Sequence, residues 1–110
     1  MEKKFDVVLL DGARDFLLSL DEKSRKKIFY NIDKSKDKND PRLLKKLDSD
    51  LWEFRTEYNG LQYRLIAFWD KRHGSNTLVI CTHGFIKKTD SIPIQELDKA
   101  KRIMYLYFSE

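Results

Sequence analysis

Five cationic residues lie on or beside predicted strands of one β-sheet, where together they could bind and act on an anion. They occur in three apolar stretches of the chain: Arg55, Arg64, then His83, Lys87 and Lys88. Side chains alternate along a strand, so His83 and Lys87 share a face. Cleavage of RNA through its own 2′-hydroxyl needs one group to remove the hydroxyl proton, one to stabilise the crowded phosphate and one to protonate the leaving 5′-oxygen. Histidine, arginine and lysine can divide these tasks without a metal ion.

The same cationic residues also have a purely structural interpretation. Lysines beside a strand often serve only to keep its edge from pairing with another chain. The residues alone leave both interpretations open, an anion-binding site and a solvated basic face. The net charge of +4, from 22 Lys plus Arg against 18 Asp plus Glu, is compatible with a polyanionic partner and does not decide between them.

Other kinds of catalytic site have weaker support in the sequence. His73 and His83 lack carboxylates or thiolates at metal-ligand spacing, so we expect no metal. No glycine-rich segment leads from a strand into a helix, so we expect no phosphate loop and no cofactor. Cys81 would share a strand face with His83, yet no neighbour in the sequence would lower the pKa of its thiol. We therefore expect Cys81 to be a small buried hydrophobic residue.

The two arginines are positioned by a predicted hairpin. Asn59-Gly60 separates two alternating apolar runs and is the preferred centre of a two-residue type I′ turn. This turn sets Arg55 directly opposite Arg64, because it fixes the register of both strands. Like charges opposed on a strand pair are destabilising. A fold that keeps them there spreads them into solvent or uses them together to hold an anion. The other face is apolar and predicted to be core: Trp52, Phe54, Thr56 and Tyr58 opposite Ala67, Leu65, Tyr63 and Leu61.

The remaining elements follow from hydrophobic periodicity and turn residues. We predict a strand, two helices, a connection, the hairpin, a loop, a third long strand and a final helix: 5–10, 13–19, 21 to about 36, 41–49, 51–69, 70–76, 77–86 and 94–107. The order is βααβββα, an α+β domain with helices against one sheet. The sheet face that carries Arg55 and Arg64 is the predicted working surface.

Length and composition predict one domain spanning residues 1–110. With 41% hydrophobic residues, this length is enough for a core without metal or disulfide support. A single cysteine is typical of a reducing compartment. The apolar run near the N-terminus is too short for a signal peptide, and no segment approaches the roughly 20 apolar residues of a membrane span. We expect a soluble cytoplasmic protein that does not bind membranes.

Three sequence segments together resemble a known toxin family. They are Leu51-Trp52-Glu53-Phe54-Arg55, Tyr63-Arg64-Leu65-Ile66 and His83-Gly84-Phe85-Ile86-Lys87-Lys88-Thr89, followed by a lysine-rich final helix. The ordered set is similar to the HigB-type, phage-derived branch of the RelE/ParE toxin superfamily. The resemblance implies a small twisted antiparallel sheet with two N-terminal helices and one C-terminal helix. It also implies the toxin of a type II toxin–antitoxin system, neutralised by a neighbouring antitoxin that often has a helix-turn-helix domain.

HigB-like and RelE-like toxins enter the ribosomal A site and cut mRNA there, and the resemblance assigns roles accordingly. Arg64 would bind the phosphate or transition state, and Arg55 would contact the mRNA backbone. Lys87 or Lys88 would stabilise charge or donate a proton. His83 would be the general base, unless it is a strand histidine that packs in the sheet and hydrogen-bonds locally.

Further RNA contacts are expected outside this cationic group. Tyr105 and Tyr107 in the final helix would stack on a base, as aromatic residues do with single-stranded RNA, or would instead anchor the core. Five other basic residues are expected on ribosomal RNA backbone, where they would steepen the salt dependence of ribosome association: Lys45, Lys46, Lys99, Lys101 and Arg102.

Two rival functions remain for a chain of this kind. The ParE side of the superfamily shares the fold but inhibits DNA gyrase, and fold alone does not separate the two targets. A chain that has lost activity would be a binding module for antitoxin or nucleic acid. The Lys87-Lys88 pair and the two arginines favour RNA cleavage over gyrase inhibition.

Overall fold

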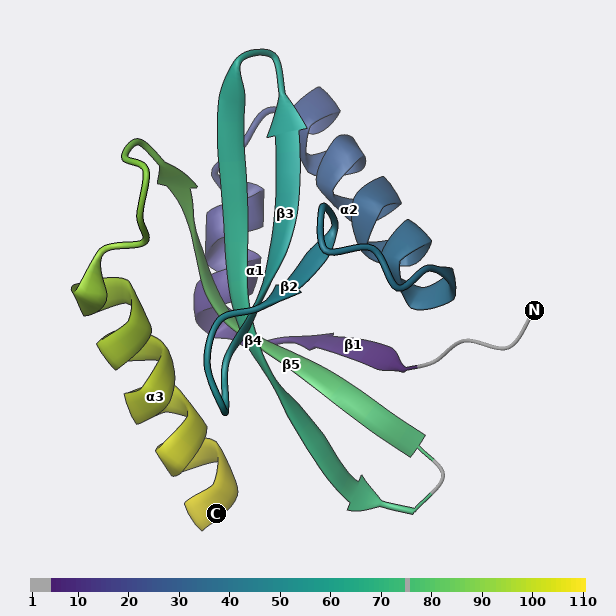
Figure 1. The fold of residues 1–110 in the computed structure, drawn as a ribbon, viewed down its shortest axis with the longest axis vertical. Coiled ribbons are helices and arrows are strands. Elements are labelled where there is room, and N and C mark those ends of the chain that lie inside the picture. The colour runs from purple at the N-terminus through teal and green to yellow at the C-terminus, as the bar shows by residue number, and fades with distance from the viewer. Residues whose placement is uncertain (1–4, 75) are drawn as a thin grey trace.

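A five-stranded sheet forms the centre of the molecule, and three helices pack against it (Figure 1). The computed structural model describes residues 5–74 and 76–110. Its elements are β1 (Asp6–Leu9), α1 (Asp11–Leu18), α2 (Glu22–Asp37), β2 (Leu44–Lys46), β3 (Trp52–Tyr58), β4 (Leu61–His73), β5 (Asn76–Lys87) and α3 (Ile94–Ser109). The strands lie in the order β1-β5-β4-β3-β2. This architecture confirms the predicted α+β class.

The β3–β4 hairpin has the predicted register. Asn59 and Gly60 have φ angles of 54° and 79°, the positive values that a type I′ turn requires. Tyr58 pairs with Leu61, and the ladder continues to Trp52 opposite Ala67, with Arg55 facing Arg64. A local turn signal thus sets the position of both arginines.

Three predictions about the sheet are wrong. The segment 41–49 is not a plain connection, because residues 44–46 form β2 on the outer edge of β3. The sheet is mixed rather than antiparallel, since β1 pairs in parallel with β5. The segment predicted as a loop at 70–76 is mostly strand: β4 runs to His73 and β5 begins at Asn76, with residue 75 outside the described residues. A three-residue strand is too short to show a periodic pattern. The pairing of β1 with β5 joins distant segments, so no local turn residues indicate it.

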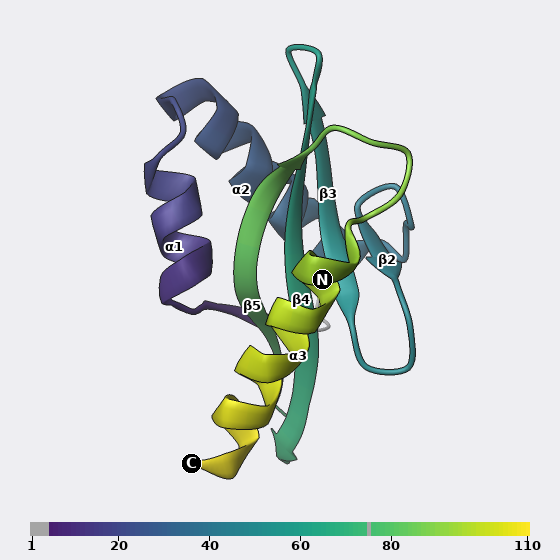
Figure 2. The ribbon, with the colours of Figure 1, turned by 90° about the vertical axis from the view of Figure 1, so that its left-hand side faces the viewer.

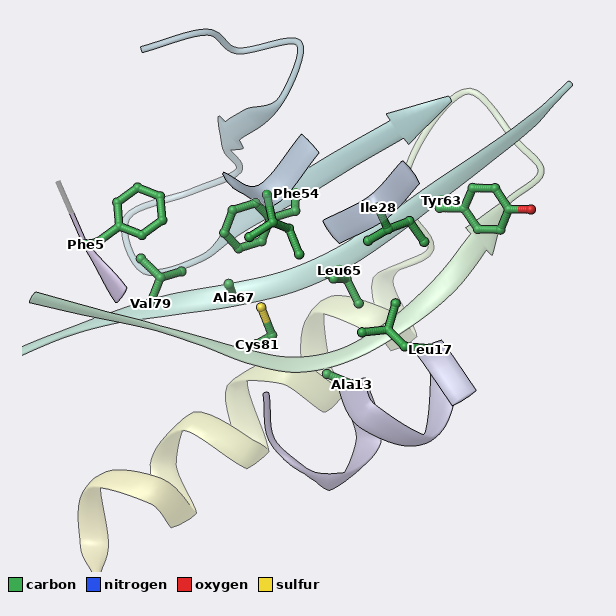
Figure 3. Close-up of a cluster of buried hydrophobic side chains, with 11 residues drawn as sticks. Phe5, Ala13, Leu17, Ile28, Phe54, Tyr63, Leu65, Ala67, Val79 and Cys81 are labelled. Atoms are coloured by element: carbon green, nitrogen blue, oxygen red, sulfur yellow. The ribbon is translucent and has the colours of Figure 1, made fainter. Parts of the chain in front are cut away.

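One face of the sheet carries α1 and α2 (Figure 2). Ala13 and Leu17 from α1, together with Ile28 from α2, pack against side chains of β3, β4 and β5 (Figure 3). The N-terminus of α2 is capped by Asp21, whose Oδ2 accepts a hydrogen bond from the Ser24 amide at 3.2 Å. Fully buried Cys81 belongs to this cluster, and burial raises the pKa of its thiol, as expected for an inert core residue.

The opposite face is partly covered by α3, which corrects the expectation that it would be a free working surface. Ala100 and Met104 pack there against a second apolar cluster that includes Ile66, Phe68 and Ile80. These strand residues alternate with the core residues of the first face, so this part of the sheet is apolar on both faces and α3 buries the second one. The end of this sheet face near Arg55 and Arg64 is not covered by α3.

No helix in the described part of the chain is long and apolar enough to cross a membrane.

Candidate functional site

The uncovered end of the sheet carries three rows of side chains across β3, β4 and β5. The strand registers give these rows, from the hairpin inward: Glu57–Gln62–Lys87, Arg55–Arg64–Phe85 and Glu53–Ile66–His83. His83, Phe85 and Lys87 therefore share one face, as predicted. The sheet brings Arg55 and Arg64 together and sets Lys87 one row away.

A buried glutamate lies between the two arginines. Glu53 and Arg64 are each 3% exposed, and Glu53 Oε1 lies 3.3 Å from Arg64 Nε. Glu53 Oε2 lies 3.6 Å from Arg55 Nε. Burial lowers the pKa of Arg64, and the nearby charge of Glu53 opposes this shift. The opposed arginines are thus neither dispersed in solvent nor dependent on a foreign anion, because one strand supplies a carboxylate two residues before Arg55.

The ion pair at the centre of this cluster is incompletely hydrogen-bonded. Glu53 Oε1 and Arg64 Nε are both buried, and neither makes a hydrogen bond to a described protein group. The other two nitrogens of Arg64 donate to the Tyr63 carbonyl at 3.0 Å and to Gln62 Oε1 at 2.9 Å. Arg55 donates to the Pro41 carbonyl at 3.3 Å. Glu53 Oε1 and Arg64 Nε lie 3.3 Å apart, so the ion pair rests on charge rather than on a well-directed hydrogen bond.

A cavity of about 260 Å³ opens beside this pair, and four charged residues line it: Arg42, Arg55, Glu57 and Arg64. Three guanidinium groups line this cavity, and their planar geometry matches that of a phosphate. Glu53 and Asp40 balance part of their charge, so anion binding would rest on this geometry as well as on charge. Arg42 comes from the segment before β2. It is held by Asp40 through a two-point contact, with Nε and Nη2 donating at 3.1 and 2.9 Å.

Three members of this cluster are absent from the predicted site residues. Glu53 and Glu57 alternate with Arg55 on β3, so strand parity already placed them on its face, but their charges were not included in the site. Arg42 had no such signal, because the segment that holds it was predicted as a connection. The cluster contains more acidic groups than a purely cationic site would.

His83 lies apart from the cavity and is buried. Its Nε2 is 3.1 Å from Glu96 Oε1 on α3, and its Nδ1 is 2.9 Å from Thr82 Oγ1. The hydroxyl of Thr82 donates its single proton to the Ile66 carbonyl at 3.2 Å, so its oxygen is left as an acceptor for Nδ1, while Nε2 lies against the carboxylate of Glu96. Burial lowers the pKa of His83, and the contact with Glu96 opposes that shift. These contacts match the alternative of a locally hydrogen-bonded strand histidine.

A bulge in β5 separates His83 from Cys81. Ala67 pairs with Cys81, whereas the preceding residue Ile66 pairs with His83, so Thr82 is the extra residue. Cys81 points into the first core, and His83 lies on the other face. The expectation that the two residues share a strand face is therefore wrong, because the bulge resets the alternation.

The other predicted site residues lie around this face or beyond it. Lys87 is half-buried and Lys88 is exposed. Lys45 pairs with Glu53 in register, and Lys46, Lys99 and Arg102 are exposed.

Three more of the predicted RNA contacts lie on α3. Lys101 forms an ion pair with Asp48 at 3.2 Å. The hydroxyl of Tyr107 donates to Asp70 at 2.7 Å, and its ring packs on Phe68, so it anchors the helix. Tyr105 is exposed.

The glycine of the His-Gly-Phe segment has a packing role. A β-carbon on Gly84 would meet the Phe16 ring of α1 and would lie 2.7 Å from a methyl group of Leu65. The first helix can lie against β5 only because this position has no side chain. The residue after His83 therefore helps to hold the strand that also carries Lys87.

Among residues 5–74 and 76–110, no group of three or more His, Cys, Asp or Glu side chains is arranged to hold a metal ion. The cavity itself offers arginines and a single carboxylate. This donor set suits a phosphate and proton transfer.

Comparison with known proteins gives one family match. The model of the family described as "Phage derived protein Gp49-like (DUF891)" matches residues 15–105, which include every residue that lines the cavity. No curated protein matches the chain.

Proposed function

The chain belongs to the Gp49-like family of phage-derived proteins, part of the RelE/HigB-like group of toxins, and we propose that it is a ribosome-dependent endoribonuclease. It would be the toxin of a type II toxin–antitoxin pair and would cut mRNA in the ribosomal A site. Family membership supports the toxin role in general and implies a cognate antitoxin. The observation that carries the cleavage proposal is the cavity with three arginines and one carboxylate beside Lys87.

Arg64, Arg55 and Arg42 would bind the scissile phosphate. Their guanidinium groups would stabilise the extra negative charge of the pentacoordinate phosphorus. Glu53 would hold Arg55 and Arg64 at fixed positions through the contacts at 3.6 and 3.3 Å. Such fixed dipoles and charges need no reorganisation during the reaction, which is the physical basis of their effect.

Glu57 would accept the proton of the attacking 2′-hydroxyl. It is exposed, lines the cavity and is the one carboxylate among the four lining residues. The 2′-oxygen would bond to phosphorus as the bond from phosphorus to the 5′-oxygen breaks. Lys87 or Lys88 would protonate the leaving 5′-oxygen, leaving a 2′,3′-cyclic phosphate and a 5′-hydroxyl. We assign His83 to holding β5 and α3 in position and not to proton transfer, because its ring is buried between Thr82 of β5 and Glu96 of α3.

The ribosome would supply much of the substrate alignment. The cavity is small and open, and it holds few groups that would orient a flexible RNA strand by themselves. Exposed Lys45, Lys46, Lys88, Lys99 and Arg102 would contact ribosomal RNA backbone. Neutral substitutions at these positions should weaken ribosome binding and flatten its salt dependence.

The proposal is tested by mapping mRNA 5′ ends after brief induction. Wild-type protein should produce new ends at fixed positions within translated codons, and the ends should carry 5′-hydroxyl groups. A variant with Arg64→Lys, Lys87→Ala and Lys88→Ala should lose them while keeping its circular dichroism spectrum, with a moderately lower Tm because Arg64 is buried and donates two hydrogen bonds. Growth arrest without new ends, together with altered supercoiling, would instead indicate gyrase inhibition. No arrest and no new ends would indicate a binding module.

A further inference from the structure

The far end of β4 has a strand neighbour on one side only. β3 begins at Trp52, which pairs with Ala67, so the rest of β4 is bordered by β5 and by no strand on the β3 side among the described residues. Figure 1 shows this β4–β5 ribbon extending past the other strands. Main-chain groups alternate along a strand, and those of Ala67 face β3. The amide and carbonyl of Trp69 therefore point to the side where β3 has ended.

A cleft of about 720 Å³ lies along this open edge. Trp52 and Trp69 form an aromatic wall on one side, with their rings 5.5 Å apart. Phe108 and Met104 of α3 line the other side. The cleft thus combines an edge that can form main-chain hydrogen bonds with apolar surface for side chains on both sides, the two features of a site for an added strand.

The rim of the cleft is basic. Lys46 and Lys71 line it and form no ion pair with a described residue, whereas the charge of Arg72 is matched by Asp70. Asp50 is the one acidic residue of the lining. A second copy of this chain would bring the same lysines to the edge and would be repelled. An acidic segment is complementary in charge.

We propose that this cleft binds an extended acidic segment of the cognate antitoxin, which adds to β4 as a short strand beside Trp69. Carboxylates of that segment would lie near Lys46 and Lys71, and an apolar side chain would enter between Trp52 and Phe108. This inference relies on the toxin assignment for the existence of the antitoxin. It does not depend on RNA cleavage, because the cleft and the arginine cavity share no lining residue.

Hydrogen exchange on the purified complex with the antitoxin encoded beside this gene tests the binding site. The amide of Trp69 should exchange at least tenfold more slowly in the complex than in the free protein. The free protein should show no such protection at high concentration. Slow exchange of Trp69 in the concentrated free protein, with a dimeric mass, would show that a second copy fills the edge and would overturn the proposal.

Charge reversal of Lys71 gives an independent measurement. Lys71→Glu should raise the Kd for that antitoxin about tenfold or more, measured by titration calorimetry. Lys23→Glu, on an exposed lysine of α2, is the matched control and should leave the Kd unchanged. Equal effects of both changes, or protection confined to other strands, would place the antitoxin elsewhere. Failure of the cleavage proposal would appear only in the 5′-end maps and would leave these results unaffected.

Discussion

Two buried carboxylates on the same sheet, Glu53 and Asp70, are each paired with arginine but bonded very differently. Asp70 is fully buried and accepts hydrogen bonds from the amide, Nε and Nη2 of Arg72 at 3.1, 3.0 and 3.0 Å, and from the Tyr107 hydroxyl at 2.7 Å. Glu53 is 3% exposed and makes two ionic contacts, at 3.3 and 3.6 Å. Asp70 thus accepts short hydrogen bonds from Arg72 and Tyr107, whereas Glu53 makes longer ionic contacts beside a cavity.

This contrast separates a structural lock from a candidate site. The Asp70 cluster ties the end of α3 to β4, and the hydrogen bonds from Arg72, the largest cause, hold the pKa of Asp70 well below its usual range. The Glu53 cluster lies beside a cavity that three arginines line, and its ion pairs are longer, at 3.3 and 3.6 Å.

The largest effect is expected for Glu57→Gln, the proposed proton acceptor. The rate of mRNA cleavage should fall about 100-fold, in the range typical of a lost general base. The Tm should stay within about 1 °C of wild type because Glu57 is exposed and outside both cores. Glu22→Gln on α2 is the matched control. Single-turnover cleavage on programmed ribosomes measures the rate, and a variant with wild-type rate would remove Glu57 from the reaction.

Asp70→Asn should act on stability instead of cleavage. The free energy of unfolding should fall by about 2 kcal/mol at pH 7, because an amide cannot accept all the bonds that the carboxylate accepts. The hydrogen bonds from Arg72 hold the folded pKa of Asp70 below that of an unfolded chain, so its stabilising contribution is present above the unfolded pKa and is lost as the pH falls through the folded pKa. The variant should therefore lose less stability than wild type between pH 4.5 and 2.5 in urea titrations. Parallel curves would show that Asp70 is not the group responsible.

The smallest effect is expected for His83→Gln. The loss of its contacts with Thr82 and Glu96 should lower the free energy of unfolding by about 1 kcal/mol at neutral pH. Burial and the charge of Lys99 lower the folded pKa below 6.5, and Glu96 opposes both. The unfolded chain therefore takes up the proton first, and wild-type stability should decline from pH 7 to 5 more steeply than that of the variant. Cleavage should stay within about threefold, and a 100-fold loss in a stable variant would return His83 to the reaction.

The positions of the two arginines follow from local sequence. The Asn59-Gly60 turn and the period of two along β3 and β4 determine which residues face each other, and both signals are contained within 20 neighbouring residues or fewer. The same period of two placed Lys87 on one face with His83 and Phe85. These features could be predicted because each rests on short-range geometry.

The features that were missed depend on distant parts of the chain. Arg42 reaches the cavity only because a three-residue strand, β2, pairs with β3. The bulge at Thr82 moves His83 away from Cys81, and no turn residue marks it. The role of Glu53 as a shared partner depends on side-chain burial, which strand alternation does not reveal. Such details are decided by tertiary packing.

The central claim is tested most directly by making the same substitution in the two clusters. Arg64→Lys and Arg72→Lys each keep the charge and remove a planar guanidinium group beside a buried carboxylate. For each protein, one would measure the cleavage rate on programmed ribosomes and the free energy of unfolding in urea. The assignment of the phosphate site to the Glu53 cluster predicts that Arg64→Lys loses about 100-fold in cleavage, and that Arg72→Lys cleaves normally but loses about 1 kcal/mol of stability. Normal cleavage by a folded Arg64→Lys variant would contradict it.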